Sequence, residues 1–198
     1  MVSSIWHTHN YNHMKTLKKS GILLLIIFLA FVALGLFLNK QEYQLETEIN
    51  RPVEEVFQLF NDHNRLSEWL TEVKSFESIT ETEDKVGSKY KLMIDNDGKI
   101  VELIETLTGY KENEMLKMDF TAGWMHKYNH FTFEKSDNGT KIIAKYSIEG
   151  TNPFARSLFL FFTKTFQEID STNLSRFKTF AEKQPILIAP TTEIEIVN

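Results

Sequence analysis

Cysteine is absent from the 198 residues of this chain. Its absence excludes disulfides, thiolate nucleophiles, and zinc or iron–sulfur centres held by cysteine. It leaves the redox compartment open, because a cysteine-free chain tolerates any of them. Several kinds of chemistry are therefore excluded before any motif is considered.

Acidic residues are missing from the first 40 positions, which contain four lysines. The remainder of the chain therefore holds all 27 acidic residues and is net negative. Affinity for nucleic acid rests largely on Lys and Arg side chains that neutralise phosphates. The charge distribution argues against a nucleic-acid-binding protein.

Residues 21–38, GILLLIIFLAFVALGLFL, form an unbroken apolar run. At 1.5 Å per residue it spans roughly 27 Å, close to the hydrocarbon thickness of a bilayer. A cleavable signal peptide would end in small residues, whereas Leu36, Phe37 and Leu38 are bulky. The run therefore predicts an uncleaved transmembrane anchor, with a signal peptide as the alternative.

The flanking charges predict an orientation for this anchor. Lys15, Lys18 and Lys19 precede it, and Lys40 and Arg51 follow it. The positive-inside rule then places the N-terminus in the cytoplasm and the following domain outside. Gly21 and Gly35 are too far apart for a GxxxG dimer motif, so we expect a monomer.

Residues 1–20 read as a disordered, basic flank. His7, His9 and His13 could suggest a metal-binding tract, but no carboxylate or cysteine completes a site there. Met14 opens MKTLKKSGILLL, which has the charged start and apolar run of a complete membrane-targeting segment. Our hypothesis is that Met14 initiates translation, and intact-mass analysis of natively expressed protein that found only the longer form would contradict it.

After residue 40 the periodicity of apolar residues predicts a single α+β domain over residues 41–183. A strand with period-2 alternation covers residues 43–50, and two short helices follow, the second carrying Trp69. Turn signals at 85–88, 95–98, 111–114 and 137–139 divide residues 73–150 into six strands of an antiparallel meander. A long helix covers 153–183, and residues 184–198 read as an extended tail.

The long helix suggests the overall shape. Its apolar residues follow helical spacing over about eight turns, which is too long for an ordinary surface helix. We therefore expect a curved antiparallel sheet of about seven strands wrapped around this helix.

This order of elements resembles the helix-grip fold of the SRPBCC or START-like superfamily, in particular its polyketide cyclase/dehydrase and lipid-transport group. The resemblance rests on a strand followed by Arg51-Pro52, on Val56-Phe57, on Trp69 followed by Val73, and on a closing helix with Leu174, Phe177, Lys178 and Ala181-Glu182. It implies a hydrophobic cavity between the sheet and the closing helix that holds an apolar molecule. We expect no cofactor.

Strand alternation predicts which side chains face such a cavity. The predicted inward sets are Tyr90, Leu92 and Ile94; Val101, Leu103 and Leu107; Leu116, Met118, Phe120 and Trp124; Phe131 and Phe133; and Ile142, Ala144, Tyr146 and Ile148. From these sets and the closing helix, the candidate ligand contacts are Tyr90, Leu103, Phe120, Trp124, Asn129, Phe131, Tyr146, Leu158, Phe162 and Phe166. Most inward residues of any strand are simply core.

Catalytic signals are few. Glu105 and Tyr146 fall on inward positions and are the candidates for acid–base chemistry, although a Glu at a strand end is usually solvated. His126 and His130 are four apart on a strand, about 13 Å from one another, which is too far to share one metal ion. We expect no metal site.

Three classes of function remain. The first is a membrane-anchored module that binds a lipid or another small hydrophobic molecule. The second is a cyclase- or dehydratase-type enzyme acting on an apolar substrate, for which Glu105→Ala should abolish turnover without loss of folding. The third is a protein-interaction module like the cochaperone branch of the same fold, against which an extracytoplasmic location argues.

Overall fold

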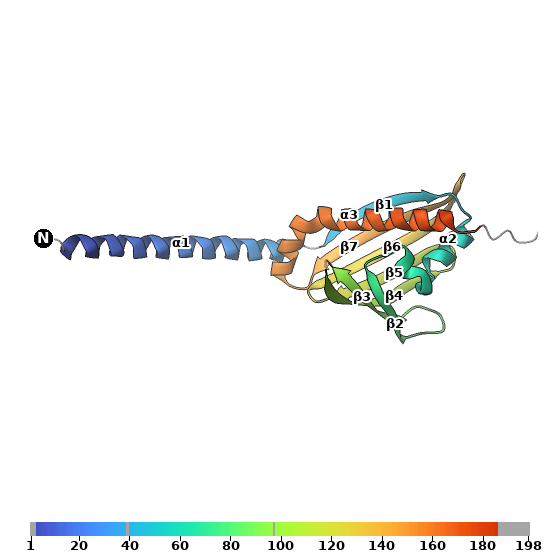
Figure 1. Cartoon of the computed structure of the whole chain (residues 1–198), viewed down its shortest axis with the longest axis horizontal. Coiled ribbons are helices and arrows are strands. Elements are labelled where there is room, and N and C mark those ends of the chain that lie inside the picture. The colour runs from blue at the N-terminus through green and yellow to red at the C-terminus, as the bar shows by residue number, and fades with distance from the viewer. Residues whose placement is uncertain (1–2, 39, 97, 186–198) are drawn as a thin grey trace, which may run out of the picture.

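The computed structural model describes residues 3–38, 40–96 and 98–185, with side chains from residue 17 onward. Its elements are α1 (Ser3–Phe37), β1 (Gln41–Ile49), α2 (Val53–Phe60), the 3-10 helix η1 (His63–Glu68), β2 (Val73–Thr80), β3 (Lys89–Asn96), β4 (Lys99–Lys111), β5 (Met115–Ala122), β6 (Met125–Ser136), β7 (Gly139–Gly150) and α3 (Pro153–Lys183). In Figure 1, α1 projects away from the domain, and α3 lies across the sheet.

The seven strands form one antiparallel sheet in the order β1-β7-β6-β5-β4-β3-β2. Strands β2 to β7 are a meander, and β1 pairs with β7 at the edge. The predicted fold class and the predicted number of strands between the helices are both confirmed. The turn at Gly139 has a φ of 136° and passes so close to Arg51 that a Cβ would lie 2.6 Å from its backbone nitrogen, so glycine suits this position.

The core is densest where α2 and the second half of α3 meet the sheet. Val53, Val56, Phe57 and Phe60 are the buried face of α2, as their spacing predicts. The Phe60 ring lies 4.8 Å from the Phe131 ring and 4.8 Å from the Phe177 ring. This aromatic contact joins α2, β6 and α3, and it closes the end of the domain farthest from α1.

Arg51 has a structural role at the same end. Its side chain is buried and pairs with Glu55 at 2.7 Å, and its guanidinium donates to the backbone carbonyl of Gln184. The Thr140 hydroxyl donates to the Arg51 carbonyl at 2.7 Å. Arg51 therefore connects the start of α2, the β6–β7 turn and the end of α3.

The first half of α3 differs from the prediction. Leu174, Phe177, Phe180 and Ala181 are buried, but Phe162 and Ile169 are 45% and 51% exposed. The helix lies mainly over β1 and β7, and its first turns extend past the sheet towards α1. The apolar stripe of α3 therefore does not lie against the sheet along its whole length.

Helix α1 begins at Ser3, whereas the composition of residues 1–20 predicts a disordered flank. Extending an existing helix costs little compared with nucleating one, so the apolar run is able to propagate helix into its flank. The predicted extended tail falls almost entirely on residues 186–198, which lie outside the described part of the chain.

Candidate functional site

The inner face of the sheet is the face covered by α2 and α3, and the strand register shows how its residues line up. From the α2 end towards the α1 end, successive cross-strand rows are Leu116, Phe131 and Ala144; then Leu107, Met118, Asn129 and Tyr146; then Tyr90, Glu105, Phe120, Lys127 and Ile148. The first row is buried, and in the third row Tyr90, Glu105 and Ile148 are buried while Phe120 and Lys127 are partly buried. In the direction of α1 the inner face thus gains charged residues and becomes partly open over β5 and β6.

Glu105 is a buried carboxyl group on this face, with only 4% of the residue exposed. Among the described residues, no side chain forms an ion pair or hydrogen bond with it. Burial raises the pKa of Glu105 to about 7. A carboxyl group with this pKa exchanges protons readily near neutrality, which makes it a candidate acid or base.

A small cavity of about 150 Å³ adjoins Glu105. Its lining includes Tyr90 and Met118 from the sheet and His63 from η1. The His63 ring stacks on Phe76 at 4.3 Å and lies 4.8 Å from the Tyr90 ring, and burial lowers the pKa of His63. The cavity therefore brings a neutral imidazole, a phenol and a carboxyl group to one place.

A buried ion pair stands farther along the same face. Lys127 Nζ lies 2.5 Å from Asp170 Oδ1, and the Tyr43 hydroxyl donates to Asp170 Oδ2 at 2.5 Å. The Lys127 ammonium also lies 5.1 Å from the centre of the Tyr146 ring, which stacks on Tyr43. This network joins α3 to β1, β6 and β7.

The same network keeps two phenols protonated. Burial, together with the charge of Asp170, raises the pKa of Tyr43 and of Tyr146 well above the usual value for tyrosine. Both hydroxyl groups are therefore neutral at physiological pH. Tyr146, a predicted catalytic candidate, is suited to donating a hydrogen bond and poorly suited to acting as a base.

Asn129 lies between Met118 and Tyr146 in the second row. Its side-chain oxygen is buried and has no hydrogen-bond partner among the described residues. Buried polar atoms in proteins are nearly always paired, so an unpaired acceptor on this face is a natural contact for a donor on a ligand.

The other predicted site residues fall into two groups. Tyr90, Leu103, Phe120, Asn129, Phe131 and Tyr146 lie on the inner face, with Phe131 deep in the core and Leu103 only partly buried. Trp124, Leu158, Phe162 and Phe166 lie at the α1 end or on the first half of α3. Trp124 is in the β5–β6 turn and 59% exposed, so its predicted inward position is wrong, because strand alternation stops where the strand ends at Ala122.

The larger hollow of the domain, about 620 Å³, is mainly on the opposite face of the sheet. Its lining side chains are mostly polar, among them Lys117, Asp119, Tyr128, His130 and Lys145. The enclosed space beside Glu105 is smaller than the 300–1,000 Å³ of most ligand pockets. A sizeable ligand would therefore have to use the half-buried part of the inner face as well.

A curved antiparallel sheet that grips a long C-terminal helix, with polar groups set into an otherwise apolar inner face, defines a helix-grip protein with a hydrophobic-ligand-binding fold. The chain belongs to the polyketide cyclase/dehydrase and lipid transport family, whose model matches residues 40–182. The resemblance found in the sequence is thus confirmed. No curated protein sequence matches the chain significantly.

Solved structures share the fold at low sequence identity. TTHA0849 from Thermus thermophilus is 22% identical with a TM-score of 0.60, covering 71% of this chain and 97% of its own. The Zhui aromatase/cyclase from Streptomyces sp. R1128 is 12% identical with a TM-score of 0.59, covering 72% and 94%. SA2116 from Staphylococcus aureus is 16% identical with a TM-score of 0.55, covering 74% and 98%. At these identities the likeness concerns the fold alone.

Four residues of the site were missed by the sequence reasoning: Tyr43, His63, Lys127 and Asp170. Lys127 has the same parity as Asn129 and Phe131, so alternation alone would have placed it inward. Asp170 follows Phe166 and precedes Leu174 at a spacing of four, which puts it on the buried stripe of α3. The available signal was that Lys127 and Asp170, which have opposite charges, each fall on a face that the pattern predicts to be buried.

Proposed function

We propose that the protein binds a small hydrophobic molecule, such as a lipid, on the inner face of the sheet while α1 holds the domain at a membrane. The observation that carries this proposal is the combination of half-buried apolar residues at the α1 end with buried polar groups, Glu105 and Asn129, on the same face. Leu103 and Phe120 offer apolar contact, and Glu105 and Asn129 offer hydrogen bonds to a polar end of the ligand.

The membrane part of the proposal rests on α1. Its residues Leu17–Phe37 contain an 18-residue window with a mean hydropathy of 2.8 and are long enough to cross a bilayer. Almost all of this segment is exposed in the structure, whereas an apolar helix of a soluble protein is normally buried. A retained anchor explains that exposure.

A substitution that fills the inner face tests ligand binding. Leu103→Trp is expected to weaken binding of a fluorescent fatty acid by the full-length protein in detergent by about tenfold or more, since an indole would occupy ligand space. Glu102→Trp is the matched control, because Glu102 is the neighbouring residue on the opposite, exposed face. Equal affinities of the two variants would contradict the proposal, as would a purified protein that neither carries nor takes up lipid by native mass spectrometry.

The orientation of the anchor has its own test, which the absence of cysteine makes simple. Single cysteines are introduced at Thr16, between Met14 and the apolar run, and at the exposed Asn138 in the β6–β7 turn. With the N-terminus in the cytoplasm, a membrane-impermeant maleimide should label Asn138→Cys in intact cells and Thr16→Cys only after permeabilisation. The reverse pattern would place the domain inside.

A second candidate function is catalysis at the cavity beside Glu105. The observation in its favour is the group of Glu105, His63 and Tyr90 around one enclosed space. With a pKa of about 7, Glu105 would be able to take a proton from a substrate carbon or hydroxyl and return it elsewhere. Glu105→Gln would abolish turnover of an apolar carbonyl substrate without loss of folding if this is the function.

A further inference from the structure

The first turns of α3 lie directly against the end of α1. The Phe154 ring is 6.2 Å from the Phe28 ring and 5.7 Å from the Phe31 ring, and the Phe161 ring stacks on Phe31 at 6.1 Å. Ser157 Oγ donates a hydrogen bond to the Phe31 carbonyl at 2.5 Å. These contacts hold residues 153–161 at the level of the last ten residues of the apolar helix.

Gly35 shows how close this approach is. It is buried, and a Cβ at this position would collide with the Pro153 carbonyl and lie 2.8 Å from Ser157 Oγ. A backbone contact of this kind requires glycine. In the described residues Gly35 is thus part of the α1–α3 contact. Its role is within one chain, and not in pairing two copies of the anchor.

The length of α1 then sets the depth of that contact. The 17 helical residues of the apolar run, 21–37, reach about 26 Å, close to a hydrocarbon core of roughly 30 Å, and Lys18 and Lys19 lie before it. If lipid ended at Phe28, residues 21–27 would reach only about 11 Å, well under half of what is needed. Lipid must therefore surround α1 beyond Phe28, which is the level at which Phe154 packs.

The surface beside this contact is apolar. Phe161 and Trp124 are 67% and 59% exposed, and Leu160 and Phe162 on the same segment of α3 are also exposed. Trp124 is part of the same surface, because its ring meets the Phe154 ring edge-on at 6.2 Å. We call the β5–β6 turn and residues 153–162 of α3 the α1-proximal surface.

The charged side chain of the α1-proximal surface, Arg156, is paired, and so are several polar groups beside it, as a low-dielectric environment favours. Arg156 forms an ion pair with Glu149 at 2.8 Å and donates to the Gly150 carbonyl at 3.0 Å. The Thr151 amide donates to the Trp124 carbonyl at 2.9 Å, and the Asn152 side chain caps the helix by accepting from the Ala155 amide. The next charged side chain along α3, Lys164, is 87% exposed and marks the end of this surface.

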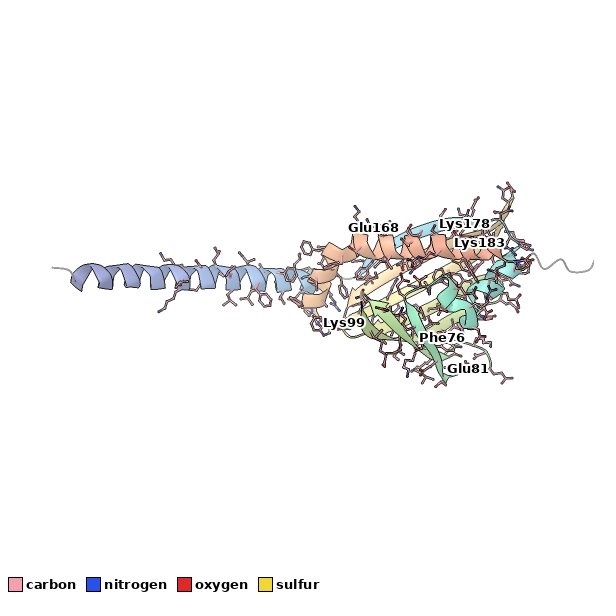
Figure 2. The ribbon with its side chains drawn as sticks, viewed as in Figure 1. Phe76, Glu81, Lys99, Glu168, Lys178 and Lys183 are labelled. Carbon is pink, nitrogen blue, oxygen red and sulfur yellow. The ribbon has the colours of Figure 1, made fainter. Side chains whose placement is uncertain are left out.

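We propose that the α1-proximal surface is immersed in the leaflet around the end of α1, so that a phospholipid bilayer is its partner. This inference rests on the proposed role of α1 as a membrane anchor. It also places the partly open end of the inner face next to the membrane. Strands β1 and β6 begin and strand β7 ends beside this surface, as Figure 1 shows, and Lys99 at the start of β4 lies on the same side of the domain in Figure 2.

Quenching of tryptophan fluorescence by brominated lipids tests the immersion. The full-length protein carries Trp6→Phe and is reconstituted in phosphatidylcholine vesicles with or without dibrominated acyl chains. Trp124 is the reporter, and Trp69, buried against Phe60 and Phe177, is an internal reference far from lipid. We expect bromine to remove most of the Trp124 emission, because quenching requires near contact with the acyl chain.

The matched control carries both Trp6→Phe and Trp124→Phe, so that only Trp69 emits. Its emission should not fall when the lipids are brominated. Flotation of the vesicles separates the two levels of the proposal. Protein that fails to float would overturn the anchor and with it the immersion. Protein that floats with Trp124 emission unaffected by bromine would overturn the immersion alone and leave the anchor standing.

Discussion

Lys127→Met is expected to lower the free energy of unfolding by about 3–5 kcal/mol, the cost of leaving one partner of a buried ion pair alone. Asp170 is 5% exposed, and Lys127 is the only cation that pairs with it among the described residues. After the substitution, the Asp170 carboxylate retains only its hydrogen bond from Tyr43. Urea unfolding of the full-length protein in detergent, followed by circular dichroism, measures the loss.

Two controls separate this effect from loss of packing. Lys145→Met changes an exposed lysine on β7 that faces outward, and it should alter stability by no more than about 0.5 kcal/mol. Combining Lys127→Met with Asp170→Asn should recover much of the stability, because the unpaired charge is then gone. Additive losses in the double variant would show that the pair does not interact as described.

Glu105→Gln is expected to change how stability depends on pH. The pKa of Glu105 is about 7 in the folded protein and 4.5 as a free side chain, so folding favours its protonated form. Its contribution is fully present below pH 4.5 and is lost as the pH rises through 7, because the unfolded chain releases the proton first. The loss amounts to about 3 kcal/mol above that range.

Glutamine cannot ionise. The difference in free energy of unfolding between the variant and the wild-type protein should therefore shift by about 3 kcal/mol in favour of the variant as the pH rises from 4.5 to 9. Denaturant unfolding of both proteins across this range gives the difference, in which the other titrating groups cancel. Glu102→Gln, on the exposed face of β4, is the matched control and should leave the profile unchanged. Parallel profiles for Glu105→Gln and the wild type would show that Glu105 titrates normally.

Much of the fold was predictable because its signals are local. Period-2 alternation in β1, helical spacing in α2 and turn residues such as Gly139 depend on neighbours within a few positions. The same alternation placed Tyr90, Glu105 and Phe131 on the inner face. It failed at Trp124, because the strand ends two residues earlier and a turn carries no such parity.

The site was predicted only in part, because its main contacts join distant segments. Asp170 meets Lys127 across 43 positions and Tyr43 across 127, and no local pattern reports such a pairing. His63 lies on η1, where no periodicity indicated that it would meet Tyr90. The predicted wall at Leu158 and Phe162 was displaced because α3 extends beyond the sheet to meet α1.

The sequence by itself determined the apolar N-terminal helix, the order of the elements, the antiparallel meander and the side of each strand that faces inward. These follow from hydropathy and from periodicities that the backbone imposes on neighbouring residues. The tertiary structure alone decided how much of the inner face is covered, which charges meet there, and that Gly35 packs on Pro153. These depend on where α3 lies over the sheet, which is set by the packing of side chains far apart in the chain.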